Sequence, residues 1–235
     1  MKTLFLSCCL AVLSCTAIWG TPCASGSLDT FVNSGATGCQ IGTVQFADFS
    51  ILPGQTIGTQ FDPAQVQVTP GGTSINPTLS FALNRIANTG QAFELFFRFS
   101  ASDSLTGASI NLTSPAASGD AAVTAILDVC PNGSFSGGAP LGCPTSPASL
   151  VVFAIDQSSL LSDSATFGLS SSFDVFVDLR LDGGQSGAAT LNSANVGVSS
   201  VPEPSAALLF TLGLSAFGVV LRARRRRFSG NGIRR

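Results

Sequence analysis

The chain contains no histidine and no tyrosine, and it has one lysine and one tryptophan among its 235 residues. Without histidine, neither a Ser-His-Asp nor a Cys-His catalytic arrangement can form. The lysine is Lys2, at the start of the chain, so a lysine nucleophile and a lysine-containing phosphate loop are also excluded from the rest of it. These absences exclude catalysis based on histidine or lysine, and we expect no catalytic residue, no metal site and no cofactor.

Positive charge is scarce between the two ends. Lys2 and seven arginines after Leu221 make up most of the 11 basic residues, which leaves Arg85, Arg98 and Arg180. Twelve of the 13 acidic residues also lie between the ends, so residues 21–200 carry a net charge of −9 while the whole chain carries −2. Such a surface repels phosphate backbones, so no nucleic-acid partner is expected. Divalent cations or basic partners are alternatives to the plainer interpretation, that the acids keep the protein soluble.

The N-terminus is typical of a secretory signal peptide. Lys2 is followed by an apolar stretch over residues 4–13 and then by small residues. We assign residues 1–20 to this peptide, with cleavage after Ala17 or after Gly20. Acylation at Cys15 is the alternative, since residues 12–15 faintly match a lipoprotein box.

The C-terminus has three parts in a fixed order. Val201, Pro202, Glu203 and Pro204 come first, and each proline holds the residue before it extended. The apolar residues 205–221 follow, which as a helix are about 25 Å long and can nearly cross a bilayer. A basic segment, 222–227, then predicts a cytoplasmic stop that places the body outside the inner membrane. Its arginines are Arg222, Arg224, Arg225, Arg226 and Arg227.

This order of parts over residues 201–227 resembles the PEP-CTERM sorting signal of bacterial envelope proteins, which is also catalogued as an "ice-binding protein C-terminal" domain. The resemblance implies an exosortase-type membrane protease as partner. It also implies a body that is released to the cell surface or outside the cell, in an envelope rich in exopolysaccharide. The extra tail 228–235 departs from the usual pattern, and an ordinary single-pass anchor is the alternative.

Four cysteines remain after the signal peptide is removed: Cys23, Cys39, Cys130 and Cys143. An even number in an exported chain predicts disulfides, with three connectivities open. Local pairing, Cys23 with Cys39 and Cys130 with Cys143, is favoured because each pair brackets one segment rich in Gly, Ser and Pro.

The remainder of the body has the period-two pattern of strands. Apolar residues alternate over 93–99, 121–129 and 173–181. Turn-forming residues separate these from six shorter candidate strands, at 44–49, 66–68, 79–83, 108–112, 150–155 and 189–198. One short helix is predicted after Ser27, with Leu28, Phe31 and Val32 on one face and Gly35 at its end. We expect an all-β fold over residues 21–200, a single antiparallel β-sandwich of jelly-roll type. The phenylalanines are interpreted as its core.

The only catalytic chemistry left open is that of paired carboxylates, as in glycoside hydrolysis. Asp174, Asp178 and Asp182 share one strand face, but each step of four residues spans about 13 Å, so a partner from another strand, such as Glu94 or Asp128, would be needed. We therefore expect a non-enzymatic structural or adhesive envelope protein. A secreted carbohydrate-active or Ca²⁺-dependent carbohydrate-binding sandwich is the alternative.

Overall fold

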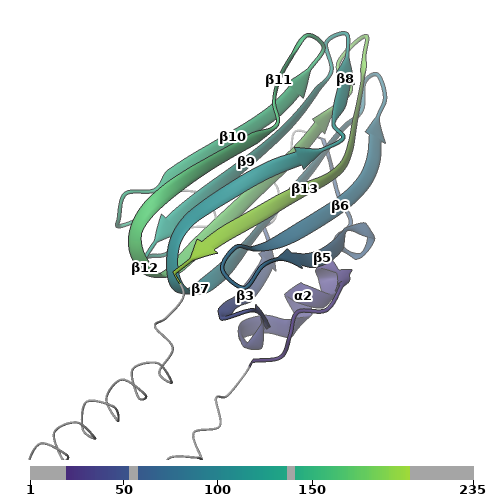
Figure 1. The fold of residues 1–235 in the computed structure, drawn as a ribbon. Helices are drawn as coiled ribbons and strands as arrows, with labels where there is room; N and C mark the ends of the chain where they lie inside the picture. Colours follow the sequence, from purple (N-terminus) through teal and green to yellow (C-terminus); the bar gives the residue numbers. More distant parts are fainter. Residues whose placement is uncertain (1–19, 53–57, 137–140, 202–235) are drawn as a thin grey trace, which may run out of the picture. The chain divides into compact units, whose positions relative to one another are not determined.

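The computed structural model describes residues 20–52, 58–136 and 141–201 (Figure 1). Most of the signal peptide, Pro202 to Pro204, the predicted membrane helix, the arginine segment and the tail lie outside the described residues. Among the residues that are described, no helix has the length and apolar character needed to cross a membrane.

Antiparallel strands dominate the described part of the chain. The short helix α2 (Leu28–Ser34) and two single turns, η1 (Gly35–Thr37) and η2 (Pro63–Gln65), lie near its start. The strands are β1 (Gly26–Ser27), β2 (Cys39–Ile41), β3 (Val44–Ile51), β4 (Thr59–Gln60), β5 (Gln67–Gly72), β6 (Pro77–Ala87), β7 (Ala92–Thr113), β8 (Ala116–Ser118), β9 (Ala122–Pro131), β10 (Ala148–Ile155), β11 (Ser158–Leu160), β12 (Ser162–Asp182) and β13 (Ala188–Ser200).

Two long strands, β7 and β12, connect two layers. The first half of β7 lies between β3 and the second half of β12, and β9, β10 and β11 continue that layer. The second half of β7 lies between β13 and the first half of β12, and β6 and β5 continue the other layer. Phe81 of β6 and Phe97 of β7 meet between the layers, with ring centroids 4.7 Å apart. The fold is a β-sandwich whose strands change layer at a bend, and its jelly-roll connectivity stays a prediction.

The sequence predicted two separate strands where β7 runs unbroken. Between the predicted segments 93–99 and 108–112 lies a run of small and polar residues, which has no hydrophobic period. Backbone pairing continues through this bend all the same, with register shifts in the partner strand after Thr166 and after Ser170. Small side chains suit a strand that bends from one layer into the other.

The period-two prediction is confirmed in the core. Leu95, Phe97 and Phe99 of β7 are fully buried, as are the alternate residues of β9 and β12. The predicted helix is also present as α2: the Ser27 hydroxyl accepts a hydrogen bond from the backbone N–H of Thr30, and Leu28 and Phe31 are buried. The alternate residues of β7 and β12 that do not enter this core point to the outside of the layer.

The favoured disulfide pairing is confirmed. Cys23 is bonded to Cys39, which ties the segment before α2 to β2. Cys130 is bonded to Cys143, which closes the loop between β9 and β10. The two closed loops have sequence separations of 16 and 13 residues, so the chain-entropy model assigns each bridge about 3 kcal/mol of stabilisation.

We predict that the mature exported protein has no free thiol. Because the four cysteines that survive signal cleavage are paired, alkylation without a reductant should add no mass. Alkylation after reduction and unfolding should add four groups, which serves as the control. Labelling of two or more cysteines in the unreduced protein would contradict the pairing.

Candidate functional site

The outer face of the layer formed by β3, β7, β12, β9 and β10 carries most of the charged side chains of the strands. On β12 it presents Asp174, Phe176, Asp178, Arg180 and Asp182, as the sequence predicted, while the alternate residues are buried in the core. The register places Ser100, Arg98, Phe96 and Glu94 of β7 opposite the first four of these residues. On the other side, β9 places Cys130, Asp128, Ile126 and Thr124 opposite the same four.

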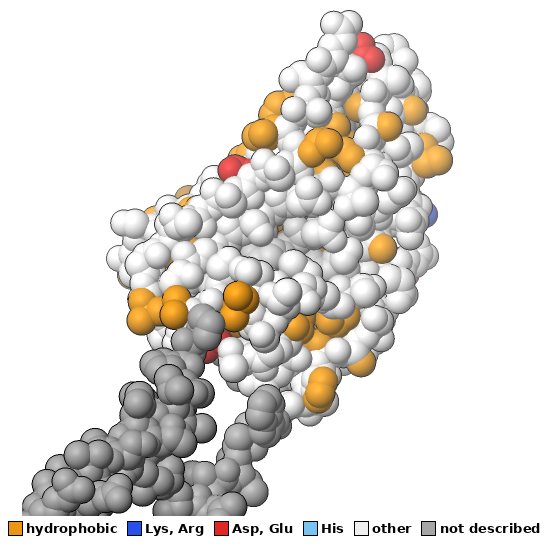
Figure 2. Space-filling view, viewed as in Figure 1, with side chains coloured by type: hydrophobic (Ala, Val, Ile, Leu, Met, Phe, Trp, Pro, Cys, Tyr) orange, Lys and Arg blue, Asp and Glu red, His pale blue; other side chains and the backbone are white. Residues whose placement is uncertain are grey.

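The other layer has a different outer surface. Figure 2 shows the side of the domain over β7, β13 and β6, where few charged side chains are visible. Asn111, Thr113 and Asn195 on this side bond to each other through uncharged groups, with N–O distances of 3.2 and 2.8 Å. The charge of the body is therefore unevenly distributed between its two faces.

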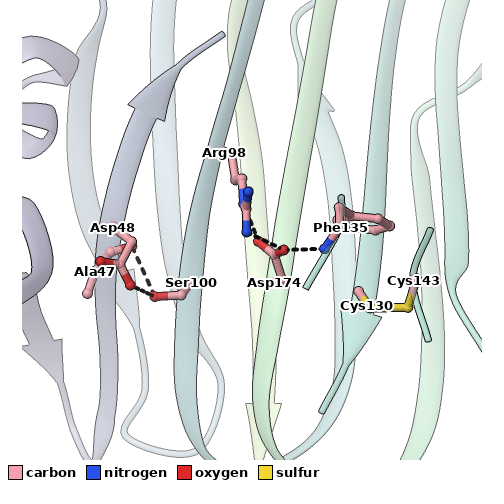
Figure 3. A network of polar contacts seen from close by, with 8 residues as sticks. All are labelled: Ala47, Asp48, Arg98, Ser100, Cys130, Phe135, Cys143 and Asp174. Atoms are coloured by element: carbon pink, nitrogen blue, oxygen red, sulfur yellow. Dashed lines mark hydrogen bonds and ion pairs between the residues drawn. A yellow bond between two sulfur atoms is a disulfide. The ribbon is translucent and has the colours of Figure 1, made fainter. Parts of the chain in front are cut away.

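A buried ion pair stands at one end of the charged face (Figure 3). Arg98 donates to the Asp174 carboxylate through Nε and Nη2, both at 2.7 Å, and the Phe135 backbone N–H donates to the same carboxylate at 2.7 Å. Asp174 is only 4% exposed, so these three donors compensate a charge that water barely reaches. The pair fastens the β9–β10 loop to the sheet.

This loop covers an aromatic cluster on the outer face. Phe96 and Phe176 are in edge-to-face contact with ring centroids 4.0 Å apart, and Phe135 of the loop packs with them beside the Cys130–Cys143 bridge. An open cavity of about 370 Å³ lies alongside, with Asp48, Ser50 and Ser100 in its lining. Because the ion pair and the aromatic rings hold one another in place, we assign this end a structural role.

A second open cavity lies further along β12. Its volume is about 270 Å³, and its lining is Ala122, Thr124, Ile126, Asp178, Arg180 and Asp182. Arg180 Nη2 donates to Asp182 Oδ2 at 3.0 Å, and Asp182 Oδ1 accepts from the Gly184 N–H at 3.0 Å. These contacts hold Arg180 against Asp182. Within the described residues, Asp178 makes no salt bridge.

Asp178 stands between two other carboxylates. Glu94 lies one diagonal step away on β7 and Asp128 one diagonal step away on β9, positions about 7–8 Å apart in a sheet. Burial and then the charge of Glu94 raise the pKa of Asp178 to about 6; Arg180 lowers it, and Asp128 raises it further. Burial also raises the pKa of Asp128.

Two carboxylate oxygens at this site lack hydrogen bonds. Within the described residues, Asp178 Oδ1 and Glu94 Oε2 are buried and accept from no donor. Glu94 as a whole is 6% exposed. An unpaired buried acceptor is costly, and perturbed carboxylates in a cavity are typical of functional sites. The raised pKa and the unpaired oxygen make Asp178 the candidate functional residue of this cavity.

The lining of the cavity does not contain two carboxylates at the spacing that glycoside hydrolysis uses, although Glu94 and Asp128, which do not line it, lie one diagonal step from Asp178. Of the acids, only Asp178 and Asp182 line it. They are four residues apart on one strand, about 13 Å, whereas the two carboxylates of glycosidases are about 5–10 Å apart. No group of three or more metal-ligating side chains is present in the part of the chain that the structure describes.

The sorting signal lies directly after the sandwich. The last strand, β13, ends at Ser200, whose N–H donates to the Ile75 carbonyl at 2.8 Å. Residues 200–226 match the family description "PEP-CTERM protein-sorting motif". This chain carries a PEP-CTERM sorting signal. The match confirms the resemblance proposed for residues 201–227, and it begins where the paired strands end.

The body of this PEP-CTERM protein has weak structural likenesses. It is 10% identical to the β-1,4-galactotriose complex of TmCBM61 (TM-score 0.27), covering 74% of this chain and 98% of that one. It is 12% identical to the Gap123 glycosylation-associated complex of Streptococcus agalactiae (TM-score 0.27), and the likeness covers 69% of this chain and 27% of that one. It is 15% identical to the CBM22-1 xylan-binding domain of Paenibacillus barcinonensis Xyn10C (TM-score 0.21), and the likeness covers 80% of this chain and 100% of that one. None of the curated proteins compared with the chain matches it.

The structure tests the predicted site residues unevenly. The four cysteines form the two predicted disulfides. Val201 is exposed directly after β13. Pro202 to Pro204 and the arginine segment lie outside the described residues. The sequence analysis gave Glu94 and Asp128 as examples of a partner on another strand, without evidence of pairing, and the register makes both of them neighbours of Asp178. It missed the pairing of Arg98 with Asp174, because no local signal joins residues 76 positions apart.

We predict that Asp178→Asn stabilises this PEP-CTERM protein at neutral pH. The pKa of Asp178 in the folded protein, about 6, lies above its ordinary value of 3.8, so the folded state binds the proton more tightly than the unfolded state. The free energy of unfolding of the wild type therefore falls as the pH rises from 3.8 to 6. A shift of about two pKa units corresponds to about 3 kcal/mol, which partial exposure reduces to about 1–2 kcal/mol.

Urea unfolding at a series of pH values measures this effect. Above pH 6 the variant should be the more stable protein, and below pH 3.8 the difference should vanish because Asp178 is protonated in both states of the wild type. Asp156→Asn, in the exposed turn between β10 and β11, is the control and should follow the wild type. If the free energy of unfolding depended on pH in the same way for Asp178→Asn and for the wild type, the raised pKa of Asp178 would be contradicted.

Proposed function

We propose that this protein is an exported envelope or extracellular-matrix protein whose sandwich is a non-enzymatic adhesive module for polysaccharide. In this proposal the signal peptide delivers the chain to the inner membrane, and the PEP-CTERM signal holds it there as a single-pass protein with its C-terminus in the cytoplasm. An exosortase-type protease then releases the body to the cell surface or the medium. The sorting signal at residues 200–226 supports the delivery part of the proposal.

The cavity around Asp178 supports the binding part. It is open, and its wall combines carboxylate acceptors, the guanidinium donors of Arg180 and the Thr124 hydroxyl. Sugar hydroxyls both donate and accept hydrogen bonds, so such a mixed set can recognise several of them at once. The wall is also held in place, since Arg180 is fixed by Asp182 and Asp182 by Gly184, which reduces the entropy lost on binding.

The positions of the carboxylates favour binding over hydrolysis. Glu94 and Asp128 do not line the cavity, and Glu94 is buried, so only Asp178 and the distant Asp182 can meet a ligand there. A general acid without a base or nucleophile at the right distance cannot complete glycoside hydrolysis. We therefore assign the site no catalytic role.

Affinity electrophoresis of the mature protein through gels containing the host's exopolysaccharide tests this function. Wild type should be retarded, and Asp178→Ala should lose most of the retardation because it removes a carboxylate acceptor from the cavity wall. Asp156→Asn should migrate like wild type. Equal mobility with and without polymer for all three proteins would overturn the proposal. Release of reducing ends from the polymer would instead favour the carbohydrate-active alternative.

A further inference from the structure

An apolar strip lies beside the Asp178 cavity on the same outer face. Val151, Ile155 and Leu160 of β10 and β11 are 38%, 46% and 45% exposed, and Phe153 between them is half-buried. The register joins Leu160 to Phe153 and Val151 to Ile126, which lines the cavity. Exposed apolar residues scattered singly are ordinary, but neighbouring ones on a single sheet face mark a contact surface. We call Ile126, Val151, Phe153, Ile155 and Leu160 the apolar strip.

The part of the face around the Asp178 cavity, next to the apolar strip, is strongly negative. Asp178, Asp182, Glu94 and Asp128 stand against a single cation, Arg180, which is already bonded to Asp182. The acids thus exceed the cations by three. Asp178 Oδ1 and Glu94 Oε2, both buried, accept from no donor in the described structure, so no neighbouring donor offsets the charge of either acid. The site therefore presents negative charge on one side and hydrocarbon on the other.

We propose that the polysaccharide bound on this face carries free amino groups, with an ammonium group at Asp178 and the C–H face of a sugar ring on the apolar strip. This inference rests on the proposed function and specifies its ligand. Strands β12 and β10 are separated by β9, so Asp178 and Val151 are about 10 Å apart across the sheet. A chain of two or three sugar units spans that distance.

The electrostatics of the site explain why an amino sugar is preferred to a neutral one. In the free protein, the ionised Asp178 carboxylate faces Glu94 and Asp128 and is opposed only by Arg180. A bound ammonium group places a positive charge beside these acids and donates up to three hydrogen bonds. An N-acetylated sugar of the same ring geometry brings neither the charge nor those donors, so it leaves the carboxylate strain in place.

Two oligosaccharides that differ only in acetylation test the proposal: a β-1,4-linked glucosamine oligomer and its N-acetylglucosamine counterpart. Calorimetry with the mature protein, at low salt and at a pH near the Asp178 pKa of about 6, should give an affinity about tenfold higher for the amine form. Added salt should weaken that binding, because the charges are partly exposed. Asp178→Asn should remove the preference, whereas Asp156→Asn should keep it.

The outcomes separate this inference from the function on which it rests. Equal affinities for the two oligomers, or a preference that survives in Asp178→Asn, would overturn the amino-sugar inference and leave polysaccharide binding intact. Binding of exopolysaccharide in gels without binding of either oligomer would do the same. Tight binding of oligolysine in place of the amine oligomer would assign the face to basic peptides and also overturn it. Failure to bind any polysaccharide would remove the proposed function itself.

Discussion

Replacing Pro202, Glu203 and Pro204 together with alanine is expected to abolish release of the protein and leave it in the inner membrane. A membrane protease needs an extended substrate, and the two prolines hold Val201 and Glu203 extended just outside the apolar segment. Glu203 also lies near the N-terminus of the predicted helix, where the helix dipole favours a negative charge. With alanines there, the helix can extend toward Ser200 and the extended segment is lost.

In the sequence, the motif follows the last strand of the sandwich directly. Strand β13 is paired up to Ser200 and the motif begins at the next residue, so the extended segment cannot be moved outward along the chain. Four residues span at most about 14 Å. We therefore expect the substitution to act fully, with no cleavage at a neighbouring position.

Intact-mass analysis of membrane and culture fractions measures this result in a host that has the protease. Released wild type should have lost everything from about Ser205 onward, including all seven tail arginines, and should carry a net charge of about −9 or −10 depending on Glu203. Alanines at Phe228, Ser229 and Asn231 in the tail provide a matched control and should be released normally. Wild type recovered from inner membranes with Arg222 to Arg227 still attached would decide for a permanent anchor.

Asp174→Ala is expected to be the most destabilising single substitution of a charged side chain on the outer face. It removes the acceptor of three hydrogen bonds and leaves the Arg98 guanidinium and the Phe135 N–H without their partner. Breaking a buried pair costs about 3–5 kcal/mol, and because the Arg98 side chain is 30% exposed, we expect about 2–4 kcal/mol here.

Urea unfolding measures the loss, and Asp182→Ala on the same strand is the matched control. The Arg180–Asp182 pair is more exposed, with side chains 33% and 37% accessible, so the control should cost about 1 kcal/mol or less. Amide hydrogen exchange should also accelerate at residues 133–136 in Asp174→Ala, because the carboxylate holds that loop to the sheet. Equal losses in the two variants would contradict the role assigned to the buried pair.

The sequence was informative wherever the signal is local. Alternation over residues 93–99 identified a strand with Leu95, Phe97 and Phe99 inward, because adjacent side chains of a strand point to opposite faces. Ser27 and Gly35 marked the ends of α2, since capping acts within one turn. The disulfide pairing followed from the composition of the bracketed loops. The sorting signal is a linear motif and was identified without any fold.

The candidate site depended on register. Nothing near Glu94 in the sequence indicates that it neighbours Asp178, and nothing near Arg98 indicates that it bonds to Asp174. A shift of one residue between β7 and β12 would turn every one of these side chains to the other face. That register is set by the whole core, in which the inward residues of β7, β9 and β12 must be buried together.

The sequence by itself determined that this protein is a disulfide-linked β protein that carries a PEP-CTERM sorting signal, because these properties rest on periodicity, spacing and linear motifs. The tertiary structure alone decided that β7 and β12 pass through both layers and that the acidic cavity lies beside the apolar strip. Both depend on contacts between residues far apart in the chain, whose pairing is fixed by packing and cannot be read from local sequence.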